Sequence, residues 1–226
     1  MEQIFQGLNI CGKKITSATK FIDFFVHDIL DYTILNKNEA NFTKDNKVFS
    51  AKHAINEISE ILEDKTKMKQ IKVRTLFVGF ENKEFLVKTD QKRFQQVLLN
   101  LYSNAVKFTN REGKITIIVQ KLGDKVRVSV VDDGLGIKKE DHTKMFSMFG
   151  TIKDVNKGIN TKGIGLGLLI SKLIVEKFNG KINFISKYNK GTTFFFDFEI
   201  QAIDMMQKAE LLVKSANKLP KQISLM

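Results

Sequence analysis

Apolar side chains repeat along this chain with two periods, one typical of helices and one typical of strands. Between positions 90 and 109 they recur every three or four residues, which predicts a helix with one apolar stripe: Phe94, Val97, Leu98, Leu101, Ala105 and Phe108. Helices are also expected near 50–69, 166–178 and, in a short form, 138–147. Strands are expected near 71–79, 84–88, 114–121, 125–132, 180–187 and 192–200.

A helical segment is expected over about 2–40, because this part lacks proline and carries an apolar stripe: Phe21, Phe25, Ile29, Tyr32 and Leu35. A linking stretch would join it to the helix at 50. Strands and helices that segregate in this way predict an α+β fold. We expect a two-layer α/β sandwich, with helices on one face of a mixed, mostly antiparallel sheet. The expected division is a helical segment at 1–45, a domain at 46–201 and a tail or linker at 202–226.

Two amides and an ammonium group share one face of the helix predicted at 90–109. Asn100 and Asn104 stand one turn apart, and Lys107 follows one step along. An amide oxygen suits a hard cation such as Mg²⁺, and an ammonium group suits phosphate charge. Taken alone, this face is more typical of a solvated helix surface with ordinary amides.

Two glycine-rich turns complete the set of candidate features. Asp132 ends a predicted strand, and Gly134 and Gly136 follow it. A carboxylate there can accept a hydrogen bond from the exocyclic amine of adenine, although Asp-Asp-Gly is also a common hairpin turn. The run from Gly163 to Leu168 (GIGLGL) opens a predicted helix, whose N–H groups and positive end can approach a polyphosphate. Close packing of small residues is the other explanation of this run.

The order of these segments resembles the catalytic and ATP-binding domain of sensor histidine kinases, within the group that includes gyrase, Hsp90 and MutL ATPases. Four boxes of that family are matched in family order: the N box at 90–109, the G1 box at 132–137, the F box at 145–149 (MFSMF) and the G2 box at 163–168. Residues 191–194 (GTTF) resemble the late strand that closes the adenine side. The resemblance covers about Phe21 to Glu199 and implies a Bergerat-type ATP-binding fold.

The resemblance also implies roles for single residues. Asn104 takes the place of the magnesium-binding asparagine, Lys107 that of the phosphate-contacting lysine, and Asp132 that of the adenine-recognising aspartate. The implied ligands are ATP and Mg²⁺. The implied nucleotide-contacting set is Asn104, Lys107, Phe108, Asp132, Gly134, Gly136, Ile137, Phe146, Phe149, Lys162, Gly163, Gly165, Leu166, Gly167, Leu168 and Thr193.

The residue at position 100, Asn100, distinguishes the kinase branch of this group from the hydrolysing branch. Hydrolysing members carry a glutamate one turn before the metal asparagine, as a base on the attacking water. An amide cannot accept that proton, which favours transfer of phosphate to a protein acceptor. Asn100, Asn104 and Lys107 are therefore the candidate catalytic residues. The implied function is the ATP-binding domain of a histidine protein kinase in a two-component phosphorelay. The alternatives are a degenerate nucleotide-binding regulatory or structural subunit, and a residual ATPase.

The family's phosphoacceptor motif, a His-Glu/Asp step followed by Arg and Thr-Pro, is absent from this sequence. Residues 21–42 resemble the second helix of the dimerisation hairpin, so His27 is interpreted as a surface or interface histidine. The sequence leaves open whether the chain is a fragment or has lost its acceptor. The expected partners are a histidine-bearing hairpin and a receiver domain, in the same full-length protein or another chain. Formation of a homodimer also stays open.

Composition narrows the partners further. The net charge is +12, but the lysines are scattered and no aromatic or arginine-rich recognition motif interleaves them, so no nucleic-acid partner is predicted. The single cysteine excludes an internal disulfide and a thiolate zinc site. No run approaches the ~20 apolar residues that cross a bilayer, and the start does not resemble a signal peptide. We expect an intracellular chain without membrane contact, while membrane attachment of a full-length protein stays open.

Overall fold

The computed structural model describes residues 43–80, 84–147, 166–204 and 206–207, and scattered positions between 4 and 30 that are all helical. His27 lies outside the described residues, as do four predicted site residues, Phe149, Lys162, Gly163 and Gly165, and Met148 of the F box. Among the described residues, none of the helices combines the length and the apolar character needed to span a membrane.

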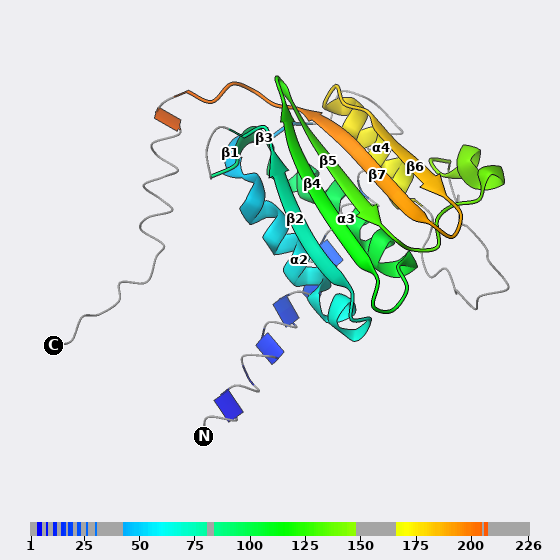
Figure 1. The fold of residues 1–226 in the computed structure, drawn as a ribbon. Helices are drawn as coiled ribbons and strands as arrows, with labels where there is room; N and C mark the ends of the chain where they lie inside the picture. The colour runs from blue at the N-terminus through cyan, green and yellow to red at the C-terminus, as the bar shows by residue number, and fades with distance from the viewer. Residues whose placement is uncertain are drawn as a thin grey trace.

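A five-stranded sheet forms one layer of the described domain (Figure 1). Its strands, in spatial order, are β2 (Lys72–Val78), β4 (Lys114–Leu122), β5 (Lys125–Asp132), β7 (Gly191–Glu199) and β6 (Ile182–Lys187). The β2–β4 pair is parallel, and the other three pairs are antiparallel. The prediction of a mixed, mostly antiparallel sheet is therefore confirmed.

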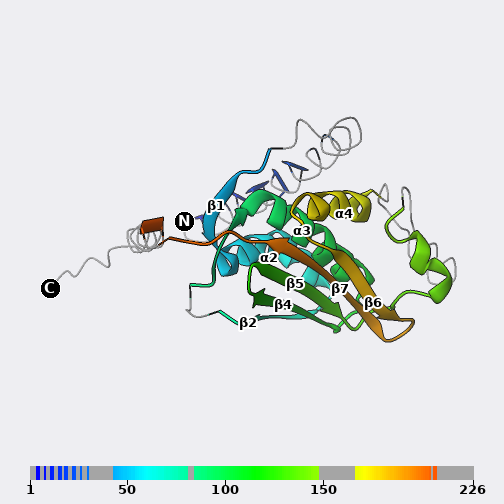
Figure 2. The ribbon, with the colours of Figure 1, turned by 90° about the horizontal axis from the view of Figure 1, so that it is seen from above.

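Helices form the second layer and cover one face of this sheet (Figure 2). In the described part of the chain they are α2 (Ala51–Met68), α3 (Gln91–Phe108) and α4 (Gly167–Lys177), with a short 3₁₀ helix, η2, at Lys139–Lys144. Side-chain oxygens cap the first two helices: Ser50 accepts from the N–H of His53 at 3.4 Å, and Asp90 accepts from the N–H of Arg93 at 3.1 Å. The two-layer sandwich predicted from the sequence is confirmed.

A second, two-stranded sheet pairs β1 (Asn46–Ser50) with β3 (Leu86–Asp90). The sequence predicted a linking stretch before the helix at 50, and this expectation was wrong for Asn46–Ser50, which form β1. It also treated the strands near 71–79 and 84–88 alike, whereas β2 joins the large sheet and β3 pairs with β1. The main-chain N–H of Gln201 donates to the carbonyl of Lys88 at 2.8 Å, so the chain after β7 also reaches β3.

Phenylalanine rings fill the interface between the helices and the sheet. Phe94 of α3 is fully buried, and its ring meets those of Phe49, Phe196 and Phe198 edge-on at centroid distances of 5.7, 5.9 and 6.1 Å. Each such side chain contributes on the order of 1.5–3 kcal/mol when it leaves water. This cluster joins β1, α3 and β7, so it holds α3 in a defined place on the sheet.

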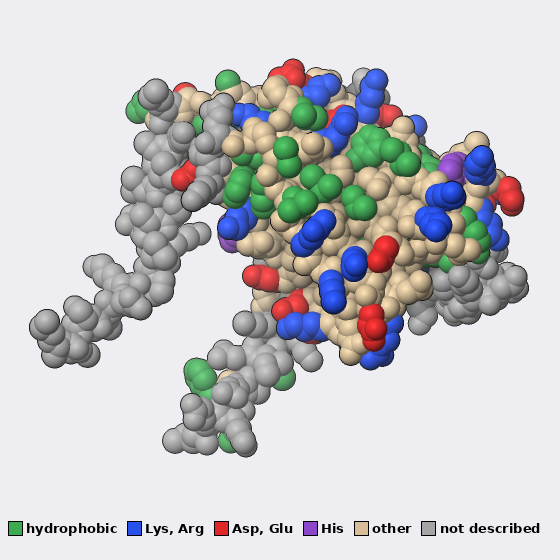
Figure 3. Space-filling view, in the orientation of Figure 1, with side chains coloured by type: hydrophobic (Ala, Val, Ile, Leu, Met, Phe, Trp, Pro, Cys, Tyr) green, Lys and Arg blue, Asp and Glu red, His purple; other side chains and the backbone are tan. Residues whose placement is uncertain are grey.

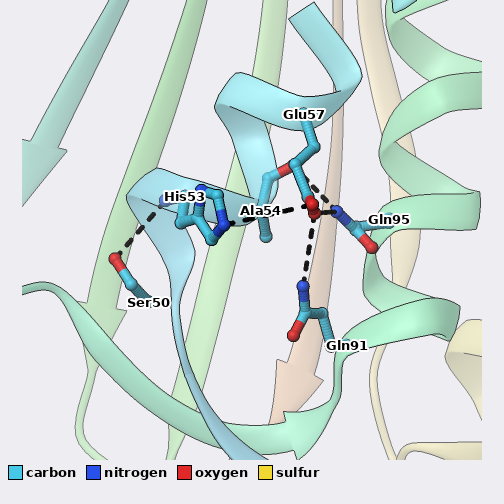
Figure 4. Close-up of polar contacts among 6 residues, drawn as sticks. All are labelled: Ser50, His53, Ala54, Glu57, Gln91 and Gln95. Atoms are coloured by element: carbon cyan, nitrogen blue, oxygen red, sulfur yellow. Dashed lines mark hydrogen bonds and ion pairs between the residues drawn. The ribbon is translucent and has the colours of Figure 1, made fainter. Parts of the chain in front are cut away.

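A polar contact fixes α2 against α3 beside this core (Figure 4). Glu57 of α2 accepts hydrogen bonds from the side-chain amides of Gln95 and Gln91 of α3, at 2.7 and 3.4 Å. The Gln95 amide also donates to the carbonyl of Ala54 at 3.1 Å. Gln95 is buried, and these bonds satisfy the amide nitrogen of its side chain.

Candidate functional site

Asp132 lies at the last position of β5, in the centre of the large sheet. Its side chain is buried and points to the helical side, because it alternates with Val131 on the other face. The carboxylate oxygen Oδ1 accepts hydrogen bonds from the N–H groups of Gly134 and Thr192, at 2.9 and 3.3 Å. Within the described residues both bonds go to Oδ1, which leaves Oδ2 able to accept a hydrogen bond from a ligand.

The surroundings of Asp132 oppose its ionisation. Burial raises the pKa of this carboxyl to about 6, although the hydrogen bonds from Gly134 and Thr192 act in the opposite direction. Asp133 raises the pKa slightly further by like-charge repulsion. The carboxyl therefore changes its charge close to neutral pH.

The turn after Asp132 is held by the hairpin between β6 and β7. The N–H of Ile137 donates to the hydroxyl of Ser186 at 2.8 Å, and that hydroxyl lies 2.9 Å from the hydroxyl of Thr192. Gly136 has φ of +67°, and a Cβ there would stand 2.2 Å from the carbonyl oxygen of Lys187. Only glycine fits this close approach of the turn to the hairpin.

A row of hydrogen-bonded side chains connects α4 with the amide face of α3. The amide nitrogen of Asn100 donates to the hydroxyl of Ser171 at 2.8 Å, and the amide nitrogen of Asn104 donates to Oδ1 of Asn100 at 3.4 Å. With its nitrogen directed to Asn100, the side chain of Asn104 presents its oxygen elsewhere. An oriented amide oxygen of this kind fits a hard divalent cation.

The first turn of α4 packs directly on Asn100. A Cβ on Gly167 would lie 2.4 Å from Oδ1 of Asn100, so any side chain at this position would displace the Asn100 amide. The N-cap residue Leu166 makes no side-chain capping bond among the described residues, so the first N–H groups of α4 keep no side-chain acceptor. Leu166 and Leu168 pack against the core from either side of Gly167.

Lys107 and Phe108 end α3 next to the turn that follows Asp132. The carbonyl of Phe108 accepts from the N–H of Leu135 at 3.2 Å, which joins the helix to that turn. The ammonium of Lys107 lies 5.1 Å from the centre of the Phe108 ring, and burial lowers the pKa of this lysine. Two distant parts of the sequence thus meet on α3: the turn after Asp132 contacts the end of the helix, and the start of α4 contacts its middle.

The structure also shows where two other predicted site residues, Thr193 and Phe146, lie. Thr193 pairs with Val131 and faces the open side of the sheet, so the structure does not bring its side chain to Asp132. Its neighbour Thr192 faces Asp132 instead. Phe146 packs against Phe184 of β6, with ring centres 6.0 Å apart.

A family model described as histidine kinase-, DNA gyrase B-, and HSP90-like ATPase matches residues 89–202. The chain belongs to this family. The matched range begins just before α3, ends after β7, and contains the turns at Asp132 and Gly167. Family and fold predictions made from the sequence are therefore confirmed.

Solved histidine kinases share this fold. The catalytic domain of the histidine kinase ThkA is 34% identical, with a TM-score of 0.58, over 69% of this chain and 95% of that domain. The histidine kinase ShkA, solved in complex with AMPPNP, has a TM-score of 0.63 over 79% of this chain and 36% of its own length. At 24% identity, ShkA shows the common fold alone.

Curated relatives are longer histidine kinases. The circadian input-output histidine kinase CikA of Synechococcus elongatus is 31% identical over 182 residues, which is 80% of this chain and 24% of CikA. The aerobic respiration control sensor protein ArcB of Escherichia coli is 39% identical over 107 residues, 47% of this chain and 14% of ArcB. The chain thus spans about a quarter or less of these relatives.

Within this histidine kinase-type ATPase domain, sequence reasoning missed three polar residues that shape the site. Ser171 anchors Asn100, while Thr192 and Ser186 hold Asp132 and the turn behind it. Ser171 carried a usable signal, since it stands one helical turn after Gly167 on the predicted helix. Thr192 and Ser186 carried none, because their positions depend on the register between β5, β7 and β6.

Proposed function

We propose that this domain binds Mg-ATP and transfers the γ-phosphate to a histidine on a partner helix, as one step of a two-component phosphorelay. Membership of the ATPase family and the complex of the structural neighbour ShkA with AMPPNP support the nucleotide as ligand. A histidine kinase relative solved with its response regulator protein, ThkA with TrrA, supports the class of partner. The acceptor histidine would lie on a hairpin of the same full-length protein or of another chain.

Asp132 would recognise the base. Its Oδ1 is held by two main-chain N–H groups, so Oδ2 is oriented and can accept a hydrogen bond from the exocyclic amine of adenine. Guanine lacks a donor at that position. The buried setting strengthens the hydrogen bond, because little water competes for the carboxylate.

The phosphates would lie between α3 and the start of α4. Lys107 supplies a positive charge from α3, and the first N–H groups of α4 supply the positive end of a helix. The oriented oxygen of Asn104 fits a magnesium ion, which when bound would neutralise phosphate charge. Phosphoryl transfer needs mainly such positioning and charge stabilisation.

The hydrogen-bonded row Ser171–Asn100–Asn104 is the observation that favours transfer of phosphate to histidine over hydrolysis of ATP. Asn100 is neutral and donates its amide protons to Ser171, so it cannot take a proton from water. In the described part of the chain, no carboxylate is hydrogen-bonded to this row. General-base hydrolysis would therefore lack a base at position 100, whereas a histidine ring is itself a nucleophile and needs none.

Labelling separates the three candidate functions. The full chain is incubated with γ-labelled ATP and Mg²⁺, alone and with a separate helical hairpin that carries a His-Glu motif. We expect acid-labile label on the hairpin that depends on its histidine. Free phosphate alone would indicate a residual ATPase, and bound nucleotide without turnover would indicate a regulatory subunit.

The magnesium assignment has its own test. We expect Mg²⁺ to tighten binding of a non-hydrolysable ATP analogue to the wild type, and Asn104→Ala to lose this increment while still binding the metal-free analogue. Calorimetry in the presence of Mg²⁺ and in the presence of EDTA measures the affinity of each protein for the analogue. Equal affinity of the wild type in both conditions would contradict the assignment of Asn104 as a magnesium ligand.

A further inference from the structure

Lys69 neutralises the end of α3 from a neighbouring helix. It is the C-cap residue of α2, and its ammonium donates hydrogen bonds to the carbonyls of Val106, Lys107 and Thr109, at 2.8, 2.8 and 2.9 Å. An ammonium group has three N–H donors, so all of them are used. The last carbonyls of a helix have no partner within the helix and carry a partial negative charge, which a cation relieves.

These carbonyls flank the one that holds the turn after Asp132. Phe108 lies between the acceptors of Lys69, and its carbonyl accepts from the N–H of Leu135. The four carbonyls from Val106 to Thr109 are thus shared by two groups: three by Lys69, one by the turn. The position of that turn relative to α3 depends on how firmly this end of the helix is held.

The main chain of Lys69 is anchored independently of its ammonium. Its carbonyl accepts from the N–H of Glu112 at 2.8 Å, and the N–H of Lys72 donates to the carbonyl of Gly113 at 2.9 Å. Loss of the side-chain charge would therefore leave the main chain in place and release only the end of α3. Burial lowers the pKa of Lys69, because its ammonium is partly removed from water.

We propose that Lys69 is a positioning residue of the nucleotide site: its ammonium locks the last turn of α3, and through Phe108 and Leu135 it places the turn after Asp132 beside Lys107. This inference rests on the proposed binding of ATP. Lys69 touches neither base nor phosphates in this scheme, and it acts through the carbonyls that it binds. Small displacements of groups that position a substrate can lower function by up to about 10²-fold.

The direct test is Lys69→Met, which keeps an unbranched side chain, one heavy atom shorter than lysine, and removes its charge. We expect the affinity for a non-hydrolysable ATP analogue to fall by at least about fivefold, at a temperature where circular dichroism shows the variant folded. Amide exchange of Leu135 should become faster as well. The matched control is Lys67→Met, because Lys67 is exposed, lies two positions away and pairs with Glu63; its affinity should stay within twofold of the wild type.

Chemical rescue separates the charge from packing. Because Cys11 is the single cysteine, a Cys11→Ser background with Lys69→Cys has its only thiol at position 69. Alkylation with 2-bromoethylamine in denaturant, followed by refolding, creates an ammonium side chain of lysine length; methyl methanethiosulfonate creates a neutral one. Affinity restored by the first reagent and not by the second supports the proposal. Equal affinity of the two adducts would overturn it.

A third variant controls for lost stability. Ile58→Val thins the buried face of α2, which lowers stability through packing and leaves the charge of Lys69 intact. It should keep wild-type affinity while folded. An affinity loss equal to that of Lys69→Met would show that Lys69 affects affinity only through the stability of the fold. If Lys69→Met does not fold, Lys69→Gln replaces it with the same expectation. A wild type that binds no ATP analogue would refute the proposed function itself, and the role of Lys69 with it.

Discussion

At the scale of single residues, Asp132 combines burial with two hydrogen bonds to one oxygen. Burial raises the pKa of its carboxyl to about 6, so the group ionises within the range of ordinary assays. The ionised form accepts from an exocyclic amine, whereas a proton on Oδ2 would oppose that donor. Affinity for an adenine nucleotide should therefore depend on the charge of this one side chain.

We predict that the ratio of wild-type to Asp132→Asn affinity for an ATP analogue falls as the pH drops through about 6 and is constant above about 7. Asparagine does not titrate, so the ratio cancels the protonation of the nucleotide's own phosphates. Calorimetry between pH 5 and 8 measures both proteins. A ratio that does not change with pH would contradict the role of Asp132 in recognition of the base.

Residue identity was predictable where a side chain's place follows from one element alone. Asn100, Asn104 and Lys107 share a helix, and helical spacing placed them on one face. Asp132 ends a strand and is inward because that strand alternates. The sequence could not show that Thr192, and not the predicted Thr193, faces Asp132, because this depends on the register between β5 and β7, which the local sequence does not determine.

At the scale of elements, α4 approaches α3 so closely at Gly167 that a Cβ there would require the Asn100 side chain to move. We predict that Gly167→Ala lowers both the free energy of unfolding and the affinity for the ATP analogue. The reason is that the methyl group displaces Asn100, and with it the row to Asn104. Urea unfolding followed by circular dichroism and calorimetry supply the two measurements.

The direction of the stability change in Gly167→Ala shows whether this glycine has a packing role. Alanine is favoured over glycine in helices by up to about 1 kcal/mol, so a glycine without a packing role would give a more stable protein on substitution. The control is a glycine with open space around it, Gly12, whose substitution by alanine should not lower affinity. Stabilisation by Gly167→Ala would contradict the packing of α4 on Asn100.

The contact between α2 and α3 gives a second prediction for the elements. Glu57→Ala removes the acceptor of the buried Gln95 amide, and we expect a loss of about 1–3 kcal/mol in the free energy of unfolding. Glu60→Ala, at an exposed position of the same helix, should change it by less than about 0.5 kcal/mol. Urea unfolding of both variants tests this, and equal effects would mean that Glu57 acts only as a surface charge.

Elements with strong local signals were predicted well. The helix expected at 90–109 is α3 at Gln91–Phe108, and the hairpin expected at 114–121 and 125–132 is β4 and β5 within one residue. β1 was missed because its five residues, NKVFS, are too few to display alternation clearly. Its partner β3 begins 36 positions after β1 ends, so the pairing that stabilises it is also invisible locally.

At the scale of the whole molecule, the buried core extends beyond the range that the family model matches. α2 lies before residue 89, yet Ala54, Ile55, Ile58 and Leu62 are completely buried against the rest of the core. Phe49 of β1 adds an aromatic contact with Phe94. The face of α3 opposite the candidate site therefore depends on α2 and β1 for its cover.

We predict that a fragment of residues 43–204 unfolds in urea as one cooperative transition, whereas a fragment of residues 89–202 does not fold alone. The shorter fragment would expose the apolar surface of α3 that α2 covers and would leave Gln95 without Glu57. It would also remove Lys69 and return the last carbonyls of α3 to water. Since the chain has no tryptophan, circular dichroism in the far and near ultraviolet is the suitable probe. A cooperative transition and native near-ultraviolet signal in the 89–202 fragment would show that α2 and β1 are accessories to a domain that is already complete.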